Sequence, residues 1–353
     1  MSHLRYDVTT HDWVVMAPER SARPHDSPAP PRDPAENGSC PFCIPSLRDA
    51  KHALLSYPDP VHPSGWSVLV LPNKYPALGA TASRSFSEEG RHFQRFDGYG
   101  AHEVIIESPE HDLPLALQPA GQVERVLASL QMRYRDLSGS DGLRAVILFK
   151  NHRPDAGSSL RHPHWQIIAT PLVPRLLRQK HAIAMDYYDH DFKCLHQILL
   201  REELAHGERI VAENDGFAAF APYASHLAYQ IRVMPKSFQA GFSRCSPVQL
   251  SQLASLLKDV LQRLYALLGD PAYNLTFVSP PIGDESQEYF QWHIDILPRL
   301  STTAGFELGS GMSINPVLPE TAAMKLRATI TEEARETLHG ARPVPAATAS
   351  FKG

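Results

Sequence analysis

The chain has 353 residues, of which 43% are hydrophobic and 20% are charged, and its formal net charge at pH 7 is −4. These values predict a soluble globular protein with an ample core and a length that suits two domains. The mild acidity excludes a general attraction to nucleic acid or to an anionic membrane, so neither is expected as a partner.

The cysteine content and the N-terminus favour the cytoplasm. Four cysteines are too few and too scattered for a disulfide framework: Cys40, Cys43, Cys194 and Cys245. The first ten residues, MSHLRYDVTT, lack the apolar core of a signal peptide, and no apolar run approaches the roughly 18 residues of a membrane span. We therefore expect a reducing compartment.

The predicted elements are short strands interrupted by two long helices. A proline-rich loop at 24–34 precedes them, and a flexible tail at 340–353 follows them. β-Branched and aromatic runs between turn residues predict antiparallel strands at 66–71, 103–107, 145–149 and 166–170. Apolar residues three and four apart predict amphipathic helices at 118–137 and 247–268.

Two segments of the first half are echoed in the second half. WSVLVLPNK from Trp66 is similar to YQIRVMPKS from Tyr229, and WQIIATP from Trp165 is similar to WHIDILP from Trp292. The repeat predicts an α+β fold of two tandem units with antiparallel sheets and flanking helices. Their link is expected near Pro174, which divides the chain into domains 1–174 and 175–353.

The repeat also predicts which unit is reactive. Pairing the two tryptophans places His164 opposite Gln291, Gln166 opposite His293 and His162 opposite Tyr289. The HPH sequence at 162–164 therefore occurs in the first unit alone. We expect a catalytic N-terminal unit and a degenerate C-terminal unit that contributes to binding.

The sequence CPFC at 40–43 favours a metal site. Two cysteines three positions apart can bind one zinc ion through their thiolates. A redox pair normally opens a helix after a strand, whereas this pair follows a proline-rich loop; an incidental pair also remains open. His111 and His162 lie near strand ends and would complete a closed structural zinc site, although His111 also fits a plain surface loop.

His164 and Gln166 are candidate catalytic residues. Side chains at 162, 164 and 166 share one face of a strand, because successive strand residues alternate between faces. A neutral imidazole is a good nucleophile toward phosphorus near pH 7, and a glutamine amide can donate to a phosphate oxygen. Alternatively, His162 and His164 are both metal ligands or ordinary strand residues.

Several other residues are candidates for binding phosphate. Asn151 and Ser159 belong to a loop of small residues that leads into the histidines, and such loops cradle phosphates, although GSS alone also fits a turn. Arg20 and Arg23 are three positions apart after a predicted strand. Paired guanidinium groups suit a polyphosphate, but a solvated pair is equally common.

Together these motifs resemble the galactose-1-phosphate uridylyltransferase family, the two-copy branch of the histidine-triad superfamily. The resemblance covers nearly the whole chain: WVVMAPERSARP from Trp13, CPFC, LPNKYPAL from Leu71, ESPEH from Glu107, and Asn151 followed by HPHWQ. In the second half it includes GERIVAENDGFAAFAPY from Gly207. The order of HPHxQ and CxxC is highly specific.

The resemblance implies a role for each matching residue. One structural zinc is expected, with the ligands Cys40, Cys43, His111 and His162. His164 is the implied nucleophile, and nucleotide contacts are implied for Arg20, Arg23, Asn73, Asn151, Ser159 and Gln166. A homodimer is compatible with the family.

The chain departs from the family pattern in its second half. Some family members bind a second metal there, but Val278 and Asp295 stand where histidines are expected, and Gln197 stands three positions after Cys194. A second metal is therefore doubtful. The stretch AGFELGSGMSINPVLPE from Ala304 is more similar to relatives that resemble ADP-glucose phosphorylase.

The expected activity is ping-pong transfer of a nucleoside monophosphate through a covalent histidine intermediate. The donor is a nucleotide sugar, either a UDP-hexose or ADP-glucose, and the acceptor is a sugar 1-phosphate or phosphate. UDP-glucose–hexose-1-phosphate uridylyl transfer is the first hypothesis, and ADP-glucose phosphorylase is the alternative. A histidine-triad nucleotide hydrolase and a non-catalytic zinc-stabilised binding protein are the rivals.

Overall fold

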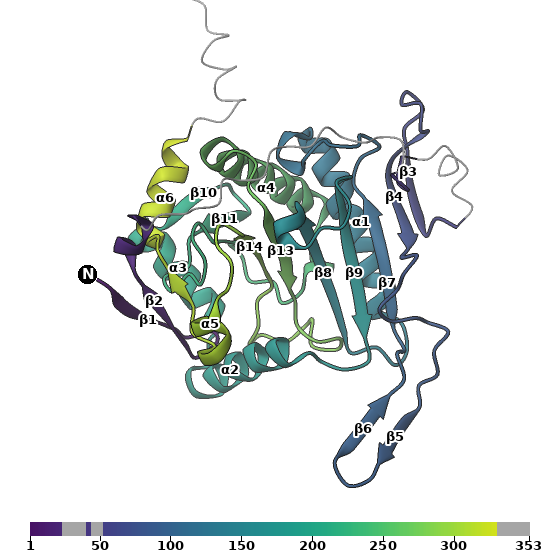
Figure 1. Ribbon diagram of the computed structural model, residues 1–353, viewed down its shortest axis with the longest axis horizontal. Helices are drawn as coiled ribbons and strands as arrows, with labels where there is room; N and C mark the ends of the chain where they lie inside the picture. The colour runs from purple at the N-terminus through teal and green to yellow at the C-terminus, as the bar shows by residue number, and fades with distance from the viewer. Residues whose placement is uncertain (23–39, 44–51, 330–353) are drawn as a thin grey trace, which may run out of the picture.

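The structure, a computed structural model, describes residues 1–22, 40–43 and 52–329 (Figure 1). Its first half contains β1 (His3–Asp7), β2 (Asp12–Met16), β3 (Leu55–Pro58), β4 (Trp66–Pro72), β5 (Phe86–Glu89), β6 (Phe93–Phe96), β7 (Ala101–Ile106), α1 (Ala120–Ser138), β8 (Ala145–His152) and β9 (His164–Thr170). The second half contains α2 (Arg175–Asp191), α3 (Leu195–His206), β10 (Ile210–Glu213), β11 (Phe217–Phe220), β12 (Ile231–Pro235), α4 (Pro247–Leu268), β13 (Tyr273–Val278), β14 (His293–Pro298), α5 (Gly305–Ser310), β15 (Ile314–Asn315) and α6 (Pro319–Ala328).

A ten-stranded antiparallel sheet forms the centre of the molecule, in the order β10-β11-β12-β14-β13-β8-β9-β7-β4-β3. Each half supplies five neighbouring strands in the same arrangement, with its fourth strand at the seam between the halves. There β8 pairs with β13, so that Asn151 lies opposite Asn274. The fold is therefore α+β with two tandem units, as predicted.

The sequence did not predict that the two units share one sheet. Each unit alone would expose an edge at β8 or β13, and an unpaired edge strand tends to pair with another strand. Pairing these two strands removes both edges. Pro174 directly precedes α2, but a common core spans both halves, so the division into domains 1–174 and 175–353 stays a prediction.

The long helices α1 and α4 cover one face of this sheet (Figure 1). They pack on each other and on a core that includes the fully buried Trp165 and Trp292. The predicted helix at 247–268 has these same bounds, because Ser246 and Gln249 form a capping box and Gly269 adopts a left-handed φ of 70° at the end. None of the helices in the described ranges is both long and apolar enough to cross a membrane.

The opposite face of the sheet differs between the halves. In the second half, α3 covers it, since Leu200 packs on Ala218, Phe220 and Met234. In the first half, this face carries the histidines of the predicted site. The four predicted strands and the helix at 118–137 are confirmed to within a few residues, whereas α2 and α3 were not predicted. The predicted loop 24–34 and tail 340–353 lie outside the described residues.

Candidate active site and metal-binding cluster

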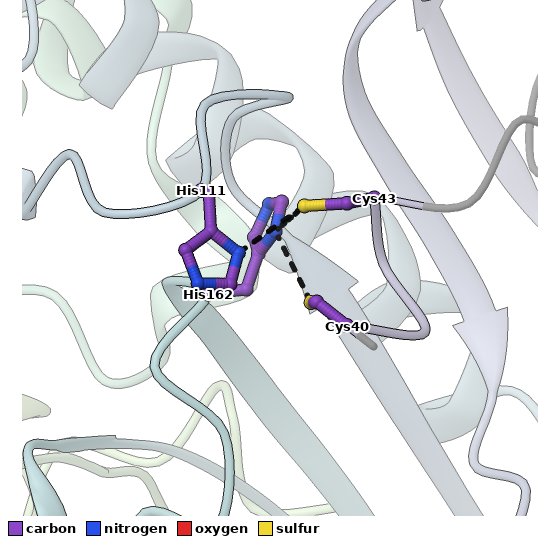
Figure 2. Close-up of side chains that lie close together, drawn as sticks. All are labelled: Cys40, Cys43, His111 and His162. Carbon is purple, nitrogen blue, oxygen red and sulfur yellow. Dashed lines mark hydrogen bonds between the residues drawn. The ribbon is translucent and has the colours of Figure 1, made fainter. Parts of the chain in front are cut away.

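Four side chains from three separate segments converge beside the start of β9 (Figure 2). The Sγ atom of Cys43 lies 3.2 Å from Nδ1 of His111 and 3.2 Å from Nδ1 of His162, and Sγ of Cys40 lies 3.8 Å from Nδ1 of His162. All four ligand atoms lie within 4.8 Å of one another. A zinc tetrahedron with bonds of about 2.0 to 2.3 Å has edges of roughly 3.3 to 3.8 Å, so the donor set fits this ion.

The surrounding hydrogen bonds orient the cluster for metal binding. Nε2 of His162 lies 2.7 Å from the carbonyl oxygen of Ser108, so Nε2 carries the proton and the lone pair of Nδ1 points at the thiols. Burial raises the pKa of Cys43 to about 11, and the neighbouring Cys40 adds to this shift. A divalent cation would reverse that preference, because coordinated thiols are deprotonated.

His164 is placed with one free ring nitrogen. Its Nδ1 lies 2.8 Å from the carbonyl oxygen of His162 and must donate to it. None of the described residues offers Nε2 a hydrogen-bonding partner, so Nε2 keeps its lone pair. Burial lowers the pKa of His164, which keeps the ring neutral near pH 7. This is the protonation state that a histidine nucleophile needs.

The common strand face of His164 and Gln166 predicts a solvent pocket in front of them, whereas the structure places His164 among the buried residues. The side chain is 6% exposed, and the ring of Phe42 lies edge-on at 5.5 Å between centroids. Cavities of about 570 and about 300 Å³ occur elsewhere, and neither includes His164.

Gln166 and Asn73 meet through a residue that the sequence analysis missed. His102, on β7, lies with Nε2 at 2.9 Å from Oε1 of Gln166 and at 3.0 Å from Nδ2 of Asn73. The backbone amide of Ala77 donates to Nδ1 of the same ring at 3.1 Å. The alternation of side chains along β7 places residue 102 on the same strand face as residues 104 and 106. This alternation does not predict that β9 is the neighbouring strand, so the sequence could not pair His102 with Gln166.

Asn151 is held from across the seam by the second half. Asn274 donates from Nδ2 to Oδ1 of Asn151 at 2.9 Å and to the carbonyl oxygen of Ala156 at 2.8 Å. The guanidinium of Arg299 donates to Oδ1 of Asn274 at 2.5 Å. This chain of contacts fixes Asn151 beside the loop that carries the exposed Ser159.

The two arginines are not placed with these residues. Arg20 is exposed on a short 3-10 helix (Pro18–Ala22) that follows β2. β2 pairs with β15 and packs on Ala224 and Leu318 of the second half, far from β7 and β4 (Figure 1). The structure therefore does not bring Arg20 beside His164, and Arg23 lies outside the described residues.

A buried ion pair lies on the core face of the sheet behind His164. Nζ of Lys150 is 2.9 Å from Oε2 of Glu107, and both side chains are at most 1% exposed. The same Nζ lies 3.5 Å from the carbonyl oxygen of His164. Burial lowers the pKa of Lys150, and the charge of Glu107 opposes this shift. Sequence alone gave no signal for this pair, since Lys150 lies on β8 and Glu107 directly follows β7.

The second half has a closed polar cluster where the first half has its site. Arg232 donates to both carboxylate oxygens of Asp295, at 2.8 and 3.1 Å, and Lys180 lies 3.6 Å from this carboxylate. Burial would raise the pKa of Asp295, but these two cations outweigh it and hold that pKa well below its usual value. Burial keeps His293 and His196 neutral by lowering their pKa values.

This arrangement bears on the doubtful second metal. Asp295 is committed to two cations, and Val278 lies opposite His293 in the β13–β14 ladder. Gln197 donates to the side chain of Gln291, and Cys194 donates to the carbonyl oxygen of Tyr289. Within the described ranges, the potential ligands that lie close enough together to hold a metal ion are the two cysteines and two histidines of the first-half cluster. The described residues of the second half therefore do not form a group of potential ligands around one ion.

The sequence is similar to galactose-1-phosphate uridylyltransferases and to ADP-glucose phosphorylase. The sequence profile described as "Galactose-1-phosphate uridyl transferase, N-terminal domain" matches residues 1–174. The chain is 33% identical over 330 residues to ADP-glucose phosphorylase of Arabidopsis thaliana, covering 92% of each sequence. It is 27% identical over 340 residues to galactose-1-phosphate uridylyltransferase of Thermotoga maritima, covering 94% of this chain and 100% of the relative.

Solved structures agree with these sequence matches. A crystal structure of ADP-glucose phosphorylase from Arabidopsis thaliana with bound ADP-glucose superposes with a TM-score of 0.78 and 30% identity, covering 93% of this chain and 99% of the other. A structure described as uridylyltransferase gives a TM-score of 0.72 with 25% identity, covering 93% and 98%.

The two-unit fold and the named relatives together define an enzyme of the nucleotidylyltransferase class. The chain belongs to the galactose-1-phosphate uridylyltransferase family: the model of this family's N-terminal domain matches its first half, and its similarity to ADP-glucose phosphorylase, 33% identity, and to galactose-1-phosphate uridylyltransferase, 27% identity, runs along almost its whole length. The resemblance stated from the sequence motifs is thereby confirmed, and the chain is a hexose-1-phosphate uridylyltransferase-like enzyme.

Proposed function

We propose that this enzyme transfers a nucleoside monophosphate from a nucleotide sugar to a phosphate-bearing acceptor through His164. Nε2 of His164 attacks the α-phosphorus, the bond from this phosphorus to the sugar phosphate oxygen breaks, and sugar 1-phosphate leaves. An oxygen of the acceptor phosphate then attacks the same phosphorus, and the phosphorus–nitrogen bond breaks. The observation that carries this proposal is the ring of His164, whose Nδ1 is fixed by a carbonyl while Nε2 has no hydrogen-bond partner among the described residues.

The neighbouring residues supply donors rather than acid–base groups. Gln166 is the proposed donor to an α-phosphate oxygen, where negative charge accumulates in the transition state. Asn73, Asn151 and Ser159 are proposed to bind the remaining phosphate and ribose oxygens. Arg20 and Arg23 stay proposed nucleotide contacts on the family resemblance alone.

Two donor–acceptor pairs are candidates. UDP-glucose with a hexose 1-phosphate, a reaction of galactose metabolism, is supported by the relatives named galactose-1-phosphate uridylyltransferase. ADP-glucose with phosphate is supported by the higher identity to ADP-glucose phosphorylase, 33% against 27%. This difference in sequence identity favours ADP-glucose and phosphate over UDP-glucose and hexose 1-phosphate as the substrates.

A labelling panel tests the proposal. The wild-type protein is incubated with UDP-, ADP- and GDP-glucose labelled at the α-phosphorus, and acid-labile protein label is measured before and after adding phosphate or galactose 1-phosphate. We expect label from one donor and its discharge by one acceptor. Discharge by water alone would indicate a hydrolase, and nucleotide binding without any label would indicate a non-catalytic protein; either result contradicts the proposal.

We further propose that Cys40, Cys43, His111 and His162 hold one structural zinc ion. Bound there, the ion would tie the CPFC segment and the loop after β7 to the start of β9. His162 is thereby anchored two residues before the nucleophile. Zinc thiolates require reduced cysteines, which is consistent with a cytoplasmic protein.

Metal analysis checks this assignment. The purified protein is expected to contain about one zinc per chain, because four ligands close one tetrahedral site. Cys43→Ser should lose most of this zinc and unfold at a lower temperature, whereas Cys194→Ser, a matched change in the second half, should keep it. Equal zinc content in both variants would contradict the ligand assignment.

A further inference from the structure

His102 lies beside Gln166 on the face of the sheet that carries His164. In the β7–β9 ladder, Val104 is opposite Gln166 and His102 is opposite Ile168, so His102 and Gln166 are diagonal neighbours. Diagonal side chains on one face lie within reach of each other. The 2.9 Å contact between Nε2 and Oε1 follows from this register.

The tautomer of His102 follows from its other nitrogen. The backbone N–H of Ala77 donates to Nδ1, so Nδ1 is unprotonated and the proton of the neutral ring is on Nε2. This N–H therefore donates to Oε1 of Gln166. The oxygen of the glutamine amide is thereby committed to His102, and its NH₂ group must point the other way.

Asn73 is turned in the same sense. Oδ1 of Asn73 accepts a hydrogen bond from the backbone N–H of Tyr75 at 2.9 Å. The backbone N–H of Asn73 donates to the carbonyl oxygen of His102 at 2.8 Å. The 3.0 Å approach of Nδ2 to Nε2 of His102 joins two donors, so it is not a hydrogen bond. The NH₂ groups of Gln166 and Asn73 thus have no acceptor among the residues that the structure describes, and an anionic oxygen would supply one.

We infer that His102 is a positioning residue, which holds the amide of Gln166 with its NH₂ group toward the α-phosphate. The inference rests on the proposed transfer through His164. A glutamine amide has two orientations of nearly equal shape, and only the hydrogen-bond partner selects between them. Without His102, the carbonyl oxygen can turn toward the phosphate and repel the charge that develops there.

Variants of His102 test the inference in single-turnover labelling. His102→Ala is expected to slow formation of the labelled protein about 10- to 100-fold, somewhat less than loss of a whole transition-state donor, with a smaller change in nucleotide-sugar affinity. His102→Gln offers a side-chain N–H at a similar reach and should restore most of the rate. His92→Ala, an exposed histidine on the β5–β6 turn, is the matched control and should behave as wild type.

A double-mutant cycle separates positioning from a general structural role. Because His102 acts through Gln166, adding His102→Ala to Gln166→Ala should slow the reaction by less than about twofold. Additive losses, an unchanged rate in His102→Ala, or failure of His102→Gln to recover activity in a folded protein would overturn the inference.

One further measurement does not depend on activity. Histidine-selective ¹⁵N NMR should show His102 as a neutral ring protonated at Nε2, and the opposite tautomer would overturn the inference. Absence of covalent label from every nucleotide sugar in the wild type would instead refute the proposed function, so the two failures are distinguishable.

Discussion

Replacing His164 by glutamine is expected to lower nucleotidylyl transfer by about four orders of magnitude or more, the scale seen when a covalent nucleophile is removed. The glutamine can keep a hydrogen bond to the carbonyl of His162, but it has no nitrogen lone pair with which to attack phosphorus. Initial rates with the donor and acceptor found in the labelling panel measure the effect. Covalent label should be absent from this variant.

The control for this change is His206→Gln, the same substitution at an exposed position on α3. It should retain the wild-type rate and the wild-type label. Nucleotide-sugar binding to His164→Gln, measured by calorimetry, should remain close to that of the wild type because the amide donors are unchanged. Retention of label by His164→Gln would show that another residue is the nucleophile.

Local sequence patterns were enough to predict the elements that carry the site. The strand at 166–170 and the CPFC turn have strong local signals, but local patterns left the role of His111 open, and the full set of Cys40, Cys43, His111 and His162 was implied by the family resemblance. The helix at 247–268 was predicted from the spacing of its apolar residues, and its observed ends match because a capping box and Gly269 bound it. Helix α2 was missed because its first turn begins immediately after Pro174 and its buried face is narrow.

The contacts between strands could not be derived in this way. His102 and Gln166 are 64 positions apart, and Asn151 and Asn274 are 123 apart. Which strands become neighbours depends on the global arrangement of the sheet, and alternation alone fixes only the face on which a side chain lies. The hydrogen bonds from Arg299 to Asn274 and from Asn274 to Asn151, across the seam between β8 and β13, therefore had no signal in any sequence motif.

The two halves also differ in what covers the sheet face opposite α1 and α4. Both halves place polar residues on the same sheet face, but α2 and α3 follow β9 and lie over the second half alone. There Arg232, Lys180 and Asp295 neutralise one another in a closed cluster. A reactive group at this position would have no access for a substrate, so the second half is suited to support the site across the seam.

Lys150→Met is expected to destabilise the protein by about 3 to 5 kcal/mol, because it leaves the carboxylate of Glu107 buried without its partner. Lys150 and Glu107 are among the least exposed charged residues of the described chain, at 1% and 0%. Urea unfolding followed by tryptophan fluorescence measures the loss, with Trp165 on the same core face as the pair. A loss below about 1 kcal/mol would contradict an intact buried ion pair.

The double variant Lys150→Met/Glu107→Gln distinguishes the two ways in which this pair can act. Neutralising Glu107 removes the unpaired charge, while the new amide oxygen can still accept from Gln118, so most of the lost stability should return. If the stability returns but the double variant labels His164 more slowly than the wild type does, the 3.5 Å contact of Lys150 with the carbonyl of His164 holds the nucleophile in place. If both return, the pair contributes to folding alone, and the carbonyl of His162 is sufficient to orient the ring.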